Sequence, residues 1–393
     1  MENTAGPRSA LVWDDAFLNY RFSDTHPMNP VRLKLTHRLA KTLGVLDREK
    51  LLQVKPPVAT DAELATIHSI DYIAQVRAAS SDANSTDPAT IANIASVYEA
   101  VGLGTEDCPV FADLHESSAR IAGGSLAAAK AIWSGQVDRA VNFAGGMHHA
   151  QRSMASGFCI YNDAALAIQH MLDQGAERIA YVDLDAHHGD GVEQAFVNDP
   201  RVLTISVHET GLLLFPGTGF AKDIGGPQAE GYAVNVAVPA SVGDAGYLRA
   251  VHAVVPQLLR SFGPEVLVTQ HGADGHRHDP LADLNLSVDG QRQLMIDASD
   301  WAEDFAGGKW LALGGGGYSP VKVVPRAWAH LIGIAADTPI PLITEIPMEW
   351  RELVSQELGL ATDDVVSSMS DDVDVWWRSW EGGYDPADAT DQS

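Results

Sequence analysis

The sequence predicts an α/β fold in which a parallel sheet carries helices on both faces. Short runs rich in β-branched residues recur along the chain, and alanine-rich helical segments lie between them. The predicted strands are Arg139 to Phe143, Arg178 to Asp185, Arg201 to His208, Glu265 to Gln270 and Lys309 to Leu313. The predicted helices are Ser125 to Ser134, Asp163 to Gln174 and Asp244 to Phe262.

Each predicted strand runs directly into a loop rich in glycine, histidine or aspartate. In chain order these loops read AGGMHH, DLDAHHGDG, HET followed by FPGTG, HGADGHRHDP and GGGGY. Ligands of doubly wound sheets bind beyond the carboxyl ends of the strands. A functional site is therefore expected where these loops meet.

The composition is that of a soluble globular protein. Hydrophobic residues make up 46% of the 393 residues and charged residues 20%. No apolar run is long enough to span a bilayer, and the N-terminus lacks the pattern of a secretory signal. With only two cysteines, Cys108 and Cys159, a cytoplasmic location and no membrane partner are expected.

The formal net charge of −26 limits the class of partner. Such a charge repels phosphate backbones, and no concentrated basic patch offsets it, so nucleic acid is not expected to bind. A cationic substrate would be attracted. Solubility or a salty habitat explains the same acidity equally well.

The segment from Asp183 to Asp190 places three carboxylates and two imidazoles in eight residues at a strand end. Alternation in an extended chain puts Asp183, Asp185 and His187 on one side, where they can converge on a divalent ion. Asp274, in HGADG, is expected to supply a further carboxylate. This set leaves a coordination position open, as in catalytic sites, where bound water has its pKa lowered toward about 7. A salt-bridged strand end is the alternative.

The adjacent His148 and His149 in GGMHHA fit either metal ligands or proton-transfer groups. Asp183 and Asp190 are expected to accept an N–H from one imidazole each. Tyr318 ends a run of four glycines, where a phenol can donate a hydrogen bond to a developing oxyanion. A phosphate-binding glycine loop is the competing interpretation, but no Lys-Ser or Lys-Thr follows this run.

These motifs together resemble the histone deacetylase superfamily. GGMHHA with SGFCIYND, DLDAHHGDGVEQAF, FPGTG, GAD and GGGGY carry the resemblance, which extends from about Asp14 to Gly333. HDPLADL and PIPLITEIPMEW resemble most the bacterial acetoin-utilisation deacetylases. The resemblance implies a single-domain arginase/deacetylase-like fold with roughly eight parallel strands, and zinc as the metal.

The resemblance also implies roles for individual residues. It assigns zinc binding to Asp185, His187 and Asp274, and a proton-transfer pair to His148 and His149 with their partners Asp183 and Asp190. It assigns polarisation of the acyl carbonyl to Tyr318. The residues implied to contact the substrate are Asp107 at the rim and Gly157, Phe158, Phe215 and Leu281 along a narrow tunnel.

Two further assignments follow from the resemblance. Asp183, Asp185 and Ser206 fall where the family coordinates a structural potassium ion, and Arg32 falls at an inner channel beneath the metal. His276 and His278 depart from the nuclear members and are interpreted as polar residues of the tunnel rim. Two carboxylates and one imidazole also make iron(II) an alternative to zinc.

The predicted function is hydrolysis of N-ε-acetyl-lysine in proteins or peptides, with an acetylated metabolic enzyme such as acetyl-CoA synthetase as the leading target. The alternatives are an acetylpolyamine amidohydrolase and a non-catalytic acyl-lysine binding module. An arginase-type ureohydrolase needs a two-metal ligand set, which the Asp-x-His plus Asp274 pattern does not provide. The sequence leaves the oligomeric state open.

Residues 8–360 are predicted to form the catalytic domain and residues 361–393 an acidic tail. From about Ala361 the chain becomes acidic and loses its hydrophobic periodicity, so this tail is expected to lie largely outside the core. Trp376, Trp377 and Trp380 interrupt it and are candidates for docking it on the domain.

Overall fold

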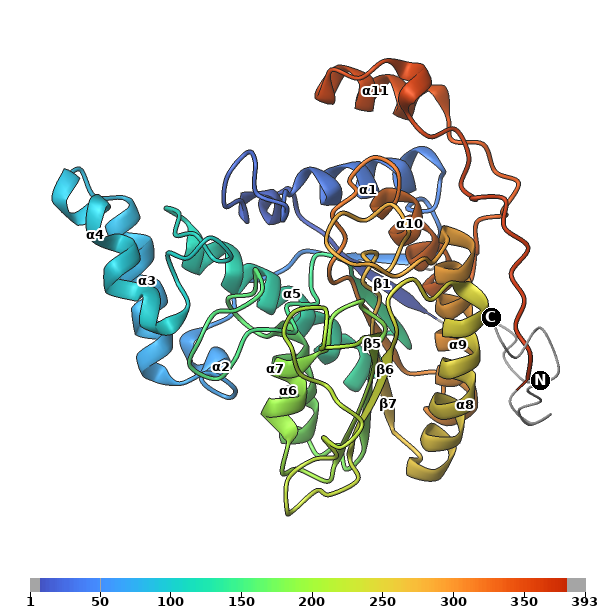
Figure 1. Ribbon diagram of the computed structural model, residues 1–393, viewed down its shortest axis with the longest axis horizontal. Helices are drawn as coiled ribbons and strands as arrows, with labels where there is room; N and C mark the ends of the chain where they lie inside the picture. Colours follow the sequence, from blue (N-terminus) through green and yellow to red (C-terminus); the bar gives the residue numbers. More distant parts are fainter. Residues whose placement is uncertain (1–7, 50, 380–393) are drawn as a thin grey trace.

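The fold is centred on one sheet of eight strands in the order β2-β1-β3-β8-β7-β4-β5-β6 (Figure 1). The computed structural model describes residues 8–49 and 51–379. Every neighbouring pair of strands is parallel. The strands are β1 (Ser9–Val12), β2 (Leu51–Val54), β3 (Arg139–Asn142), β4 (Ile179–Asp183), β5 (Val202–Glu209), β6 (Ala233–Val238), β7 (Val266–Gln270) and β8 (Trp310–Leu313).

Helices cover both faces of this sheet, with α5, α6 and α7 on one side and α8 and α9 on the other (Figure 1). Helices α3 and α4 project away from the sheet, and α11 lies over α1. The α-helices are α1 (Val31–Thr42), α2 (Asp61–Leu64), α3 (Ile70–Ala83), α4 (Pro88–Tyr98), α5 (Leu114–Trp133), α6 (Asp163–Asp173), α7 (Asp190–Phe196), α8 (Asp244–Phe262), α9 (Val288–Phe305), α10 (Val324–Ala335) and α11 (Met348–Leu358). Short 3₁₀ helices are η1 (Asp15–Asn19), η2 (Glu99–Val101) and η3 (Thr362–Asp364).

The predicted parallel sheet with helices on both faces is confirmed. All five predicted strands are present as β3, β4, β5, β7 and β8, and their side chains are fully buried, as the apolar runs indicated. Strands β1, β2 and β6 were not predicted. Two of these, β2 and β6, form the edges of the sheet and bury only part of their side chains, so their sequences carry weaker apolar runs.

The strand order explains why distant loops meet. Strands β3, β8, β7 and β4 are consecutive neighbours in the centre of the sheet. Because they are parallel, their carboxyl ends lie at the same edge, and four of the five polar loops follow them. The loop with Asp274 follows β7, which pairs directly with β4, the strand that leads into Asp185. Within the described residues, no helix combines the length and the apolar character needed to cross a membrane.

The first part of the predicted acidic tail packs against the body of the protein. Val365 and Met369 are buried, and the ring of Trp377 stacks on His252 with centroids 4.5 Å apart. Trp376 is half exposed, and Trp380 lies outside the described residues. The proposed division of the chain at residue 361 stays a prediction, but the segment that follows it contributes to the core.

Asp371 anchors this segment to the loop that follows β7. Its carboxylate lies 2.7 Å from His276 Nε2 and 2.8 Å from Arg326 Nη1, and it accepts the Val288 N–H at 3.1 Å. His276 is completely buried, so its interpretation as a rim residue is wrong. Its imidazole instead bonds to Asp371, which lies 95 residues further along the chain. Burial alone would raise the pKa of Asp371, but the hydrogen bond with His276 and the charge of Arg326 lower that pKa well below its usual value.

Asp371→Asn should lower the free energy of unfolding by about 3 kcal/mol at neutral pH, because it removes the anion from a largely buried ion pair. Since the pKa of Asp371 is depressed in the folded state, this contribution is present above the unfolded value of about 3.9 and is lost as pH falls through the folded value. Thermal unfolding of both proteins at pH 7 and near pH 3 tests this. The matched control is Asp374→Asn, which removes the same charge from an exposed neighbour; an equal effect of both substitutions would contradict a specific role for Asp371.

Candidate active site

Asp185, His187 and Asp274 converge at the carboxyl edge of the sheet. Their ligand atoms all lie within 4.8 Å of one another. His187 Nδ1 is 3.1 Å from Asp185 Oδ1 and 3.0 Å from Asp274 Oδ2. Both carboxylates are completely buried, and two buried anions this close require a compensating cation. The donor set therefore fits a divalent ion.

Glycines allow the backbone to close around these carboxylates. A Cβ at Gly272 would lie 2.1 Å from Asp185 Oδ2, and one at Gly316 would lie 1.9 Å from Asp274 Oδ2. The Gly316 N–H donates to Asp185 Oδ2 at 2.7 Å, and the Ala186 N–H donates to Asp274 Oδ1 at 3.1 Å. The glycine run thus forms one wall of the carboxylate site. The Lys-Ser or Lys-Thr that a phosphate-binding loop would need does not follow it.

Each imidazole of the histidine pair has its own carboxylate, in the pairing that the sequence analysis expected. His148 Nδ1 is 2.8 Å from Asp183 Oδ2, and His149 Nδ1 is 2.7 Å from Asp190 Oδ1. Gln151 holds the second oxygen of Asp190 at 2.8 Å. With Nδ1 of both rings engaged, Nε2 is the nitrogen left to exchange protons.

The two imidazoles differ in proton affinity although their ring centroids are only 3.9 Å apart. Burial by itself disfavours a charged imidazole, but the carboxylates of Asp183 and Asp185 raise the pKa of His148 to about 9. Burial and the neighbouring His148 lower the pKa of His149 to about 4. His149, which lines the cavity described next, is thus the neutral member of the pair.

A narrow cavity of about 190 Å³ leads to these groups, and it brings together every predicted substrate-contacting residue. Its lining consists of Asp107, His149, Gly157, Phe158, His187, Leu214, Phe215, Leu281 and Tyr318. Asp107 is exposed at this cavity, as expected of a rim residue. Leu214 was not predicted, although it directly precedes Phe215 in the same loop.

Tyr318 lines the same cavity as His149, with its ring edge-on to the Phe158 ring at a centroid distance of 5.6 Å. Burial raises the pKa of Tyr318 well above its ordinary value of 10, so the phenol keeps its proton. Beneath it, the buried Arg32 donates from Nη1 to the carbonyls of Gly315 at 2.9 Å and Gly317 at 3.1 Å. Arg32 therefore supports the loop that carries Tyr318.

Two buried aspartates that the sequence did not single out also support the site. Asp279 accepts the N–H of Tyr318 at 2.7 Å and of Leu281 at 3.0 Å, and burial together with the charge of Asp274 raises the pKa of Asp279 to about 7. Asp163, buried at the start of α6, accepts the Met147 N–H at 2.7 Å next to the histidine pair. The aspartate before proline in HDP and the aspartate in IYND were the signals that could have indicated both.

The backbone of Phe158 is also held from outside the predicted set. Its φ of 67° lies in the left-handed region, which is unfavourable for a bulky side chain. The Tyr20 hydroxyl donates to the Phe158 carbonyl at 2.6 Å, and the His26 ring packs edge-on against the Phe158 ring at 4.7 Å. These contacts fix the position of one aromatic wall.

The residues predicted for potassium are neighbours in the sheet. Asp183 on β4 pairs with Ser206 on β5, and Asp185 follows two residues later. Ser206 Oγ lies 2.7 Å from His208 Nδ1 and accepts the Gly189 N–H at 3.4 Å.

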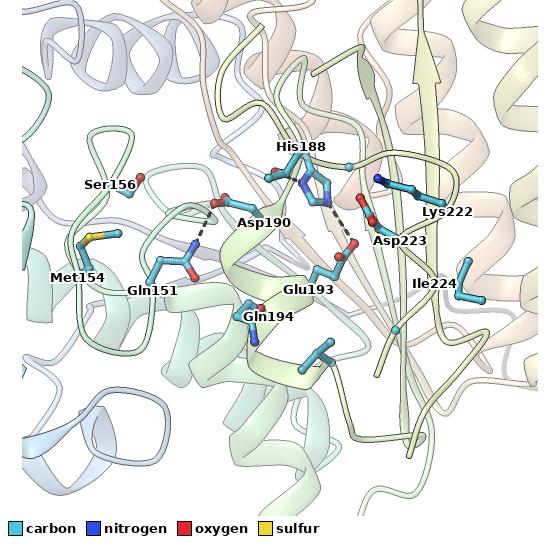
Figure 2. A pocket seen from close by; sticks show the side chains of 14 residues that line it. Gln151, Met154, Ser156, His188, Asp190, Glu193, Gln194, Lys222, Asp223 and Ile224 are labelled. Carbon is cyan, nitrogen blue, oxygen red and sulfur yellow. Dashed lines mark hydrogen bonds and ion pairs between the residues drawn. The ribbon is translucent and has the colours of Figure 1, made fainter. Parts of the chain in front are cut away.

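A wider cavity of about 800 Å³ lies beside the tunnel (Figure 2). It shares Asp190 with the active site, and Figure 2 shows Gln151 reaching this carboxylate while His188 pairs with Glu193. None of the three metal-ligand candidates lines this cavity, whereas His187 lines the smaller one, which is therefore the cavity that reaches the candidate metal site.

Comparison with known proteins agrees with this geometry. The family described as "Histone deacetylase domain" matches residues 26–335. The acetoin utilization protein AcuC of Bacillus subtilis (strain 168) is 38% identical over 369 residues, covering 94% of this chain and 91% of its own length. AcuC of Staphylococcus xylosus is 36% identical over 372 residues, covering 95% of this chain and 92% of its own length.

The fold comparison points the same way. A crystal structure of an HDAC homologue complexed with SAHA superimposes with a TM-score of 0.80 at 29% sequence identity, covering 92% of this chain and 94% of that chain. The resemblance seen in the sequence motifs is therefore confirmed over most of the chain. This chain belongs to the histone deacetylase family, whose members are metal-dependent, and it is a deacetylase of the hydrolase class.

Proposed function

We propose that this chain removes the acetyl group from the ε-amine of lysine in proteins or peptides, releasing lysine and acetate. The observation that supports it most is a single cavity that brings together the exposed Asp107, the rings of Phe158 and Phe215, Tyr318, and the buried His149 and His187. Two aromatic walls suit the methylene stem of a lysine. The exposed carboxylate at the rim suits the backbone N–H groups of a peptide.

We assign zinc as the resident ion of Asp185, His187 and Asp274, with iron(II) as the second candidate because the ligand set is hard. When bound, a divalent ion supplies Lewis acidity that polarises an amide carbonyl and lowers the pKa of water. We further assign a structural potassium ion to Asp183, Asp185 and Ser206, and an inner-channel position to Arg32.

The side chains of the site divide the remaining steps. His149, oriented by Asp190, takes a proton from the attacking water and later donates it to the leaving lysine amine as the C–N bond breaks. His148, held by Asp183, adjoins it and assists. Tyr318 donates a hydrogen bond to the oxyanion of the tetrahedral intermediate.

The physiological target of the deacetylase is proposed on different grounds from its reaction. The relatives are named for acetoin utilization, which favours an acetylated metabolic enzyme such as acetyl-CoA synthetase. If the purified protein leaves the acetylation of that enzyme unchanged, this target is excluded. The net charge of −26 favours the second candidate function, an acetylpolyamine amidohydrolase that attracts a small cation.

Removing the metal should abolish hydrolysis of a fluorogenic acetyl-lysine peptide, and adding zinc or iron(II) should restore it, because the two buried carboxylates then regain their cation. Metal content and rate are measured on the same samples, with acetylated polyamines assayed in parallel. Silence with both metals on the peptide, or a strong preference for polyamines, would reject the protein-deacetylase assignment.

Tyr318→Phe should lower kcat by about a hundredfold or more while leaving metal content unchanged, because only the oxyanion donor is lost. Tyr98→Phe is the matched control, since its hydroxyl bonds to Asp82 on α3, away from the tunnel. A rate for Tyr318→Phe close to that of the control would remove Tyr318 from the mechanism.

Gly157→Ala should lower kcat/KM by at least roughly tenfold, since misplacement at a reacting centre is costly. A Cβ at this position would lie 2.5 Å from His149 Cδ2 and 2.9 Å from Phe215 Cε1, inside the tunnel. Gly44→Ala is the matched control: Gly44 has a similarly left-handed φ of 70°, against 51° for Gly157, but an added Cβ meets no atom within 4 Å. Backbone strain should lower the unfolding temperature of both variants, whereas crowding of the tunnel should lower the rate of Gly157→Ala alone. Equal rates for the two variants would show that the tunnel lies elsewhere.

A further inference from the structure

Two large apolar side chains stand exposed next to the tunnel. Leu212 is 78% exposed and Leu213 is 72% exposed. They directly precede Leu214 and Phe215, which line the tunnel, and Phe215 itself is 41% exposed. Isolated exposed leucines are ordinary, but exposed apolar side chains gathered beside a cavity are often part of a binding surface. We refer to these two leucines as the Leu212–Leu213 patch.

The backbone that carries this patch is tightly folded. The Thr210 N–H donates to the Val238 carbonyl on β6 at 2.8 Å, and the Leu213 and Leu214 N–H groups both return to the Thr210 carbonyl, at 3.0 and 3.1 Å. The two ends of the loop also touch, because a Cβ at Gly211 would lie 2.5 Å from the Thr218 carbonyl oxygen. The leucines are therefore held outward by an ordered turn.

The occupant follows from the geometry of the tunnel. A lysine whose acylated end reaches His149 must leave its own backbone lying across the rim. Adjacent residues of an extended peptide are about 3.3 Å apart, so their side chains fall on the surface that directly borders the tunnel. Two exposed features border the tunnel there. One is the carboxylate of Asp107, and the other is the Leu212–Leu213 patch, on the loop that also supplies Phe215.

We propose that the Leu212–Leu213 patch binds an apolar side chain next to the acetylated lysine, so that the preferred substrates are protein segments in which a hydrophobic residue flanks that lysine. This inference rests on the proposed deacetylase function and adds a sequence preference to it. The patch is uncharged on a protein with a net charge of −26, so it selects by burial of apolar surface instead of by charge. An acetylated polyamine carries no flanking side chain that could use it.

A peptide panel tests this directly. Short peptides containing one acetyl-lysine are compared with leucine, phenylalanine, serine or aspartate placed immediately before it or immediately after it, using zinc-loaded full-length protein. We expect kcat/KM to be higher by roughly tenfold for leucine or phenylalanine than for serine at one of the two positions, mainly through KM. The double variant Leu212→Ser with Leu213→Ser should bring this ratio close to one.

Ile343→Ser is the matched control, because Ile343 is 92% exposed and lies in the connection before α11. It should retain both the rate and the preference. Unfolding temperatures of all variants are measured so that a misfolded double variant is recognised; in that case Leu213→Ser alone is tested by the same ratio.

The possible failures are distinguishable. If no peptide is hydrolysed, the proposed function itself fails. If all peptides are hydrolysed at similar kcat/KM, or if the double variant keeps the preference, the function stands and the patch is not a substrate site. Sedimentation at the assay concentration tests whether the patch instead binds a second copy of the chain. If the wild-type protein is a dimer and the double variant is a monomer, the patch serves self-association and the proposal is overturned.

Discussion

The organisation of this protein depends on two carboxylates that are sealed from solvent at the centre of a sheet edge. Asp185 and Asp274 repel each other, and neither can be hydrated, so the fold must supply positive charge and hydrogen-bond donors around them. His187 lies between them, two backbone N–H groups donate to them, and glycines remove the side chains that would otherwise occupy their space. A divalent ion held by Asp185, His187 and Asp274 would complete this compensation, and binding of the metal would then be coupled to the integrity of the site.

Around that centre, each imidazole of the histidine pair is oriented by a carboxylate that itself has a further partner. Tyr181 donates to the Asp183 carboxylate at 2.6 Å, and Asp183 in turn holds His148. Gln151 holds Asp190, which holds His149. Such outer contacts restrict the rotamers of the two imidazoles, and groups that are already rigidly placed need no reorganisation during a reaction. The strand order allows these contacts to form at one place, because the loops after four adjacent parallel strands supply the side chains of the site.

The sequence predicted the central part of this arrangement well, for physical reasons that also explain its gaps. Buried parallel strands leave long apolar runs, and a charged cluster directly after such a run has few structural uses, so Asp185, His187 and His148 were identifiable. Asp279 and Asp163 lie in the HDP and IYND motifs, but a motif alone does not reveal which backbone N–H groups its carboxylate accepts, and Tyr20 lies in no such motif. His276 was misplaced for the same reason: its partner Asp371 lies in a segment whose acidic composition gave no sign that it is anchored.

The contact between Asp371 and His276 has a consequence for how the protein is made. His276 lies two residues from Asp274, but the carboxylate that anchors this loop is synthesised 95 residues later. A nascent chain that has already formed most of the sheet therefore still lacks the anchor of its ligand loop. The anchor of this loop becomes available only after residues as far as Asp371 have been made and have folded back on the body of the protein.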